Sequence, residues 1–202
     1  MVLKLAIFIS GRRSNMEALF NACKDETYPA KPVLVLSNKP DAKGLETEQA
    51  AGITTEIIDQ REYKGDKAGF EQAMLNVLEN YDIDLICLAG CMRLLSAEFI
   101  SRWDNKIINI HPSLLPEYKG LDTHARAIAD GAQRAGCSVH FVVPEMDAGP
   151  IILQKEVNID KGETPESLAD KVLVQEHIAY PQAVKLIAEG RVNIIDDQVI
   201  IG

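Results

Sequence analysis

The chain has 202 residues, with 21 Lys and Arg against 30 Asp and Glu, which gives a formal net charge of −9 at pH 7 with histidine counted as neutral. Hydrophobic residues make up 47% and charged residues 25%, a composition typical of soluble globular proteins and unlike that of disordered or fibrous ones. The acidic balance argues against a nucleic-acid partner, because neutralising phosphates requires an excess of Lys and Arg. A small anionic substrate stays possible, since it needs only a local basic or amide-lined pocket.

The cysteines and the N-terminus indicate the compartment. Cys23, Cys87, Cys91 and Cys137 lie beside apolar residues and show no metal-binding spacing, so we expect free, partly buried thiols and no metal site. The apolar run at 2–9 has most of its basic residues after it, unlike a secretion signal. No apolar stretch approaches the roughly 18 residues of a membrane span. We therefore expect a cytoplasmic protein that does not contact a membrane.

Short apolar runs alternate with longer periodic segments in the first half of the chain. The runs predict strands and the periodic segments predict helices. Alternation of this kind implies right-handed crossovers between parallel strands, so the sequence predicts an open, Rossmann-like α/β sheet with helices on both faces. The predicted strands are 3–9, 32–36, 53–58, 85–88 and 107–110, and the predicted helices are 15–23, 44–51 and 67–79.

The second half of the chain predicts an antiparallel C-terminal extension. Two apolar runs flank a segment rich in turn formers and are expected to pair as antiparallel strands. A long helix is expected to begin after Thr164 and to end before Gly190, since Thr suits the N-cap and Gly ends a helix. The predicted strands are 137–143 and 151–157, followed after the helix by a hairpin at 192–195 and 199–201. No linker interrupts the pattern, which predicts one domain over 1–202.

Two segments near the carboxyl ends of predicted strands are candidates for a ligand site, because open α/β sheets bind ligands there. The small and polar residues at 10–15 either present backbone N–H groups to a phosphate or form a plain turn with Ser14 as the N-cap of a helix. Asn109 and His111 would point to the same face of a strand. They suit a carbonyl oxygen that becomes an oxyanion, although a capping Asn and a structural His fit the spacing equally well.

A third candidate segment follows the strand predicted at 137–143. Asp147 lies in a tight Gly/Pro loop, where a carboxylate either orients or charges an imidazole, accepts a proton, or only forms an Asx turn. His140, on the preceding strand, is expected to be a hydrogen-bonded structural histidine. None of the three segments decides the function alone.

Together, these segments resemble the folate-dependent formyltransferase family over nearly the full length of the chain. The run Asn-x-His-Pro-Ser-Leu-Leu-Pro with a downstream Asp-x-Gly-Pro is highly specific to that family. The short chain and the segment at 121–124 favour its phosphoribosylglycinamide formyltransferases. The matching stretches are 36–39, 88–96, 109–120, 138–141, 147–154 and 175–177.

The resemblance implies an activity and an organisation of the chain. The formyl group of the co-substrate 10-formyltetrahydrofolate would pass to the amino group of glycinamide ribonucleotide in purine biosynthesis, with no metal. Residues 1–110 would form a parallel nucleotide-binding half, and residues 111–202 a folate-binding and catalytic half. The partners would be these small molecules, with a monomer or a homodimer as the assembly.

The resemblance also assigns roles to particular residues. Asn109 would donate to the developing oxyanion, His111 would be protonated and donate a second hydrogen bond, and Asp147 would help to organise a proton-relaying water. Arg93 would face the glutamate tail of the folate. The folate-binding positions match Met92, Arg93, Leu94, Leu95, Val142, Val143 and Asp147, and the ribonucleotide-binding positions match Gly11, Arg12, Arg13, Ser14, Asn15 and Glu176.

The nucleotide-binding segment departs from the family pattern at Arg13. The family loop usually reads Ser-Gly-x-Gly-Ser-Asn, and Arg13 replaces its second Gly. The guanidinium either assists phosphate binding or crowds it, and the sequence leaves both open. A basic residue of the late helix in some members is also absent, since Leu173 stands near its place.

Other functions are compatible with parts of this pattern. The nearest is a formyltetrahydrofolate hydrolase, which gives the formyl group to water but generally carries an N-terminal regulatory domain. Sugar-nucleotide and initiator-tRNA formyltransferases would need a further C-terminal domain. The hypothesis of a folate-binding protein without enzymatic activity rests on the departure at Arg13 alone.

Overall fold

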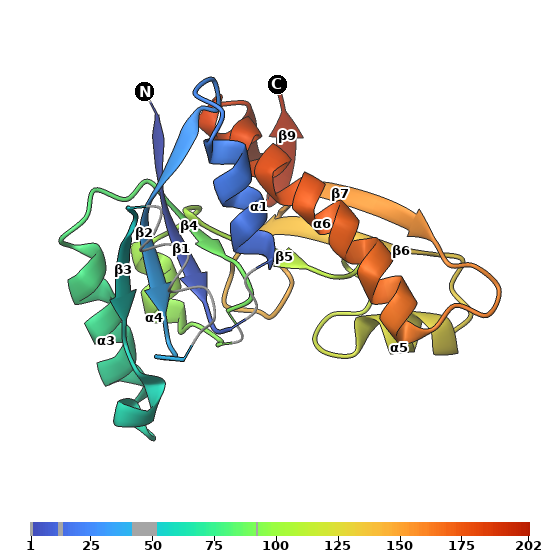
Figure 1. The fold of residues 1–202 in the computed structure, drawn as a ribbon, viewed down its shortest axis with the longest axis horizontal. Coiled ribbons are helices and arrows are strands. Elements are labelled where there is room, and N and C mark those ends of the chain that lie inside the picture. Colours follow the sequence, from blue (N-terminus) through green and yellow to red (C-terminus); the bar gives the residue numbers. More distant parts are fainter. Residues whose placement is uncertain (1, 12–13, 42–51, 92) are drawn as a thin grey trace. The chain divides into compact units, whose positions relative to one another are not determined.

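The computed structural model describes residues 2–11, 14–41, 52–91 and 93–202. The chain divides into two compact units, Met1–Ile107 and Ile108–Gly202. Figure 1 shows the elements of each unit. The helix predicted at 44–51 lies outside the described residues.

Unit 1 contains four parallel strands, joined by connections that include helices. The last five residues of the first strand and all four of the last strand are buried, as expected of strands that read as continuous apolar runs. The strands are β1 (Leu3–Ile9), β2 (Ala30–Ser37), β3 (Thr54–Ile57) and β4 (Leu85–Leu88), in the order β3-β2-β1-β4. The helices are α1 (Ser14–Cys23), the 3-10 turn η1 (Gln60–Tyr63), α3 (Lys67–Leu78) and α4 (Ala97–Arg102).

The strand order of unit 1 reverses at β1. The chain passes from β1 through β2 to β3, and then returns to place β4 on the other side of β1. Parallel sheets bind ligands outside the carboxyl ends of their strands at such a reversal. The segments that follow β1 and β4, which begin at Ser10 and Ala89, are therefore the parts of unit 1 best placed for binding.

The remaining strands of the sheet pair in antiparallel fashion. The sheet order continues with β5 (Ile107–His111), β6 (Arg134–Phe141) and β7 (Ile151–Asn158), and neighbouring strands of this group are antiparallel. The predicted fold class, a mostly parallel α/β sheet with an antiparallel C-terminal extension, is thereby confirmed. A separate hairpin follows, made of β8 (Val192–Ile195) and β9 (Gln198–Ile201).

One long helix provides most of the helical core of unit 2. Helix α6 (Pro165–Ala188) lies along β6 and β7 and also contacts α5 (Thr123–Ala129) (Figure 1). Its fully buried Tyr180 donates a hydrogen bond to the carbonyl oxygen of Ile108 on β5, at 3.2 Å. The predicted start is confirmed, because the Thr164 hydroxyl accepts from the Ser167 backbone N–H and the Ser167 hydroxyl accepts from that of Thr164.

The structure corrects some predicted boundaries and adds short helices. Strand β6 begins at Arg134 and ends at Phe141, so Val142 and Val143 belong to the following loop. The ladder stops there because the chain turns at Pro144, after the Phe141 N–H has donated to the carbonyl oxygen of Pro150. The short helices α4 and α5 and the turn η1 were not predicted. In the described part of the chain, no helix is both long enough and apolar enough to cross a bilayer.

Candidate active site

Strand β5 places two polar side chains on one face of the sheet, opposite a histidine on β6. Asn109 and His111 are two residues apart and so share a face. The register pairs Asn109 with His140 and His111 with Ser138 across the antiparallel ladder, which puts all four on that face. His111 is 6% exposed and His140 is 2% exposed. Unit 2 therefore holds a largely buried polar cluster inside its sheet.

The hydrogen bonds of His140 identify its protonated nitrogen. Its Nδ1 lies 2.8 Å from the carbonyl oxygen of Phe141, which only accepts, so Nδ1 carries the hydrogen. The other nitrogen, Nε2, then accepts from Nδ2 of Asn109 at 3.4 Å. Burial lowers the pKa of His140, and the nearby charge of Asp147 only partly opposes this. A neutral His140 thus fixes which side of the Asn109 amide bears the NH2 group.

His111 has a different environment from His140. Its Nε2 lies 3.0 Å from the carbonyl oxygen of Tyr118, and its Nδ1 lies 3.3 Å from Oδ2 of Asp147. Both ring nitrogens therefore lie close to oxygen atoms that can only accept hydrogen bonds. Asp147 Oδ1 lies 3.7 Å from Nε2 of His140, but that nitrogen already accepts from Asn109, so the closer contact of the carboxylate is with His111.

The loop between β6 and β7 holds Asp147 in place. The Gly120 N–H donates to Oδ2 of Asp147 at 3.0 Å, and the Asp147 side chain is 11% exposed. Its φ of 50° lies in the left-handed region, which Asp tolerates better than most residues. The carboxylate is thus fixed from two sides before any ligand binds.

Gly149 allows this loop to pass close to β6. A Cβ atom at Gly149 would lie 1.9 Å from the carbonyl oxygen of Phe141, the atom that accepts from His140. We expect Gly149→Ala to displace that carbonyl, to lower the free energy of unfolding by about 1–3 kcal/mol and to reduce turnover. Urea denaturation and steady-state kinetics measure both effects. Gly202→Ala is the control, because a Cβ there meets nothing within 4 Å, and equal stability of the two variants would contradict the prediction.

The lowered pKa of His140 predicts how stability depends on pH. The unfolded chain binds a proton near the ordinary value of 6.5, and the folded chain binds it only at lower pH. The contribution of neutral His140 to the free energy of unfolding is therefore fully present above pH 6.5. It is lost as the pH falls from there through the folded-state pKa. We expect urea denaturation to show a larger loss of stability between pH 7.5 and pH 5.5 for the wild type than for His140→Gln. Equal losses would show that His140 does not titrate in this way.

Unit 1 holds the residues matched to the ribonucleotide, except for one on α6. Gly11 has a φ of 152°, a conformation that side-chain-bearing residues rarely adopt, and α1 begins shortly after it at Ser14. Arg12 and Arg13 lie outside the described residues. Asn15 is on the first turn of α1, and Glu176 is a buried residue of α6 in unit 2.

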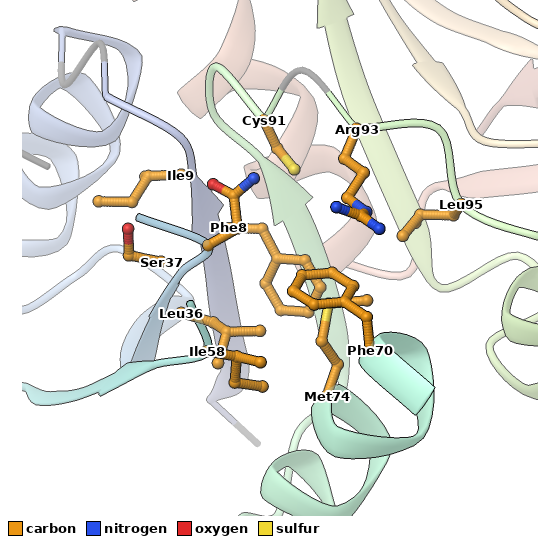
Figure 2. Close-up of a pocket in the computed structure, with 11 residues that line it drawn as sticks. Phe8, Ile9, Leu36, Ser37, Ile58, Phe70, Met74, Cys91, Arg93 and Leu95 are labelled. Atoms are coloured by element: carbon orange, nitrogen blue, oxygen red, sulfur yellow. The ribbon is translucent and has the colours of Figure 1, made fainter. Parts of the chain in front are cut away.

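The residues matched to folate binding are divided between the units. In unit 1, Arg93 and Leu95 line a pocket together with residues of β1, β2 and α3 (Figure 2), whereas Leu94 is 63% exposed. The pocket has a volume of about 10 Å³, enough for about one water molecule. Val142 and Val143 are partly buried residues of the loop after β6 in unit 2. Met92 lies outside the described residues.

The structure brings together Asn109, His111 and Asp147, which were predicted from the sequence as site residues. It also places His140 beside them. The sequence placed His140 on a strand as a hydrogen-bonded histidine, which is correct, but did not connect it with Asn109. The available signal was the spacing Ser138-x-His140, which repeats Asn109-x-His111 on a strand expected to be antiparallel. In the described ranges, no group of three or more His, Cys, Asp or Glu side chains is placed to hold a metal ion.

Comparison with known proteins identifies the family. The model of the formyl transferase family matches residues 3–184. The chain belongs to the formyl transferase family. The phosphoribosylglycinamide formyltransferase of Escherichia coli is 38% identical over 191 residues, covering 95% of this chain and 90% of that enzyme. The family membership expected from the sequence is thus confirmed.

Three further relatives extend this comparison. The trifunctional purine biosynthetic protein adenosine-3 of Gallus gallus is 46% identical over 191 residues, and the chain spans 19% of that protein's length. The structure of glycinamide ribonucleotide transformylase 1 from Symbiobacterium toebii superposes with a TM-score of 0.94 at 40% identity, covering 99% of this chain and 94% of that one. A formyltetrahydrofolate deformylase from Burkholderia mallei also matches, with a TM-score of 0.88 and 30% identity, covering all of this chain and 70% of that one.

Proposed function

We propose that this formyl transferase moves the formyl group of 10-formyltetrahydrofolate to the amino group of glycinamide ribonucleotide, as a step of purine biosynthesis. The observation that carries this proposal is the cluster of Asn109, His111 and Asp147, in which His111 is buried and its Nδ1 lies 3.3 Å from the carboxylate. The cluster provides hydrogen-bond donors for a carbonyl oxygen and a carboxylate beside them. Formyl transfer to an amine requires both the hydrogen-bond donors and the carboxylate.

Asn109 acts on the formyl oxygen. When the substrate amine attacks the formyl carbon, negative charge develops on that oxygen, and a fixed N–H donor stabilises it. One hydrogen of Asn109 Nδ2 is held by His140, which leaves the second for the formyl oxygen. The neutral state of His140 is what keeps Nδ2, and not Oδ1, on that side of the amide.

His111 supplies the second hydrogen-bond donor to the formyl oxygen, and Asp147 provides the path for the proton. His111 Nε2–H now donates to the Tyr118 carbonyl, and we propose that the formyl oxygen takes the place of that carbonyl when substrate binds. Asp147 orients the His111 ring through its contact with Nδ1 and holds a water between the reacting groups. The new C–N bond forms at the amine, the bond from the formyl carbon to folate N10 breaks, and the amine proton passes through that water to N10.

The binding roles matched from the family complete the proposal. Leu95 and the loop that contains Val142 and Val143 would contact the folate ring system, and Arg93 would bind the glutamate tail. The phosphate of the ribonucleotide would be bound by backbone groups near Gly11. The remaining assignments are Met92, Leu94 and Asp147 for the folate and Arg12, Arg13, Ser14, Asn15 and Glu176 for the ribonucleotide.

A formyltetrahydrofolate hydrolase is the second candidate, because a deformylase structure shares this fold at 30% identity. The two reactions differ only in the acceptor, which is an amine in one and water in the other. The test is the rate at which the purified protein consumes 10-formyltetrahydrofolate with and without glycinamide ribonucleotide. We expect consumption to require the ribonucleotide, and an unchanged rate without it would favour the hydrolase.

A further inference from the structure

The guanidinium of Arg93 lies on an aromatic ring. Its Cζ is 4.1 Å from the centroid of the Phe70 ring, and its Nη1 donates to Oε1 of Gln60 at 3.3 Å. Figure 2 shows the Arg93 side chain reaching toward the Phe70 ring. Within the described ranges Arg93 makes no ion pair, whereas the nearby Arg61 is paired with Asp59. Arg93 is thus a positive group that is not paired with any carboxylate in the described part of the chain.

The orientation of two side-chain amides depends on Arg93. A guanidinium has no acceptor, so the Gln60 amide must present Oε1 to it. The same Oε1 accepts from Nδ2 of Asn38 at 2.9 Å, which forces Asn38 to direct its NH2 group at Gln60. Oδ1 of Asn38 is then buried without a hydrogen-bond partner among the described residues. A buried oxygen without a partner is destabilising, and it persists here because turning the Asn38 amide would set two oxygens against each other.

Phe70 forms a rigid support under Arg93. The ring is 1% exposed and meets the Tyr63 ring edge-on, with centroids 5.7 Å apart and an angle of 74° between the planes. A cation over an aromatic face is attracted to it, so the ring holds the guanidinium without neutralising its charge. Gln60 is the one hydrogen-bond acceptor of the Arg93 side chain in the described ranges. The other guanidinium N–H groups have no acceptor among the described residues and suit bidentate binding of a carboxylate.

We propose that Gln60 and Phe70 are positioning residues that hold Arg93 ready for the carboxylates of the glutamate tail, and so set the preference for formyl donors that carry this tail. The inference rests on the proposed function, in which Arg93 binds the tail. A neutral amide suits this task, since a carboxylate at the position of Gln60 would compete with the ligand. Gln60 and Phe70 act through Arg93 and do not contact the reacting atoms.

The test compares two formyl donors that differ only in the tail. 10-Formyltetrahydrofolate carries the glutamate, and 10-formyltetrahydropteroate does not. We expect Gln60→Met to raise the KM of the first donor about fivefold, with kcat and the KM of the second donor unchanged. Gln60→Glu should raise the KM of the first donor further, because the new carboxylate pairs with Arg93. Gln72→Met is the matched control, since Gln72 is exposed on α3 and its side chain donates to Oδ1 of Asn76.

The outcomes separate this inference from the proposed function. Calorimetric binding of tetrahydrofolate and tetrahydropteroate to Arg93→Ala measures the role of Arg93 without any acceptor. If that variant loses affinity for both ligands equally, Arg93 does not bind the tail, and the inference is overturned with that role. If Arg93→Ala weakens only the tailed ligand while Gln60→Met binds like the wild type, the inference alone is overturned. An equal effect of Gln60→Met on both ligands would indicate a purely structural role and overturn it too.

Discussion

Replacing Asn109 by Ala is expected to lower kcat about 10²–10³-fold while the KM for 10-formyltetrahydrofolate changes little. The Asn109 amide donates to the formyl oxygen only as charge develops on it, so its loss affects the transition state far more than the bound donor. Its geometry does not depend on the ligand, because His140 already holds one of its two N–H groups at 3.4 Å. Steady-state kinetics with a saturating ribonucleotide measures the effect.

The control for this variant is Asn193→Ala, on an exposed position of the β8–β9 hairpin. It should have the kinetics of the wild type. Circular dichroism and urea denaturation establish that Asn109→Ala is folded. Equal losses in turnover and in folate affinity would contradict the role of Asn109 as an oxyanion donor.

Replacing Asp147 by Asn is expected to lower kcat about 10²–10⁴-fold. The amide has the size of the carboxylate, tolerates the left-handed φ of 50° and still offers an oxygen to the Gly120 N–H. What it lacks is the negative charge 3.3 Å from His111 Nδ1. The His111 ring then loses the carboxylate that faces its Nδ1, and the proposed proton relay loses its acceptor.

Asp196→Asn is the matched control for this change. Asp196 also has a left-handed φ, of 51°, and lies exposed in the β8–β9 turn. The control should leave kcat unchanged, and both variants should unfold at similar urea concentrations. Full activity of Asp147→Asn would remove the carboxylate from the mechanism.

The parallel half of the fold could be predicted because strands that are buried on both faces consist of continuous apolar residues. Strands β1 and β4 have the predicted bounds, since their buried residues form continuous apolar runs. Helices α4 and α5 could not be found in this way. Helix α4 has six residues and follows its N-cap Ser96, whose hydroxyl and N–H both donate to Glu71 on α3, 25 residues away. The N-cap of α5, Asp122, has a left-handed φ of 57° and makes no side-chain capping bond, so the usual start signal is absent.

The candidate site could be predicted only where one element carries it. The spacing of Asn109 and His111 on a strand fixes their common face. The contact of His111 with Asp147 depends on how the loop after β6 folds back, which no local pattern specifies. The lowered pKa of His140 follows from burial, its tautomer follows from the Phe141 carbonyl, and the support of Arg93 by Gln60 joins residues 33 positions apart. These features are properties of the folded chain.

The fate of a labelled formyl group tests the central claim most directly. The purified protein is incubated with 10-formyltetrahydrofolate carrying a ¹³C formyl carbon and with glycinamide ribonucleotide, and the products are measured by NMR and mass spectrometry. The account predicts that the label appears in the ribonucleotide as an N-formyl group, with one formylated product for each folate consumed. Label recovered as formate while the ribonucleotide stays unmodified would contradict it.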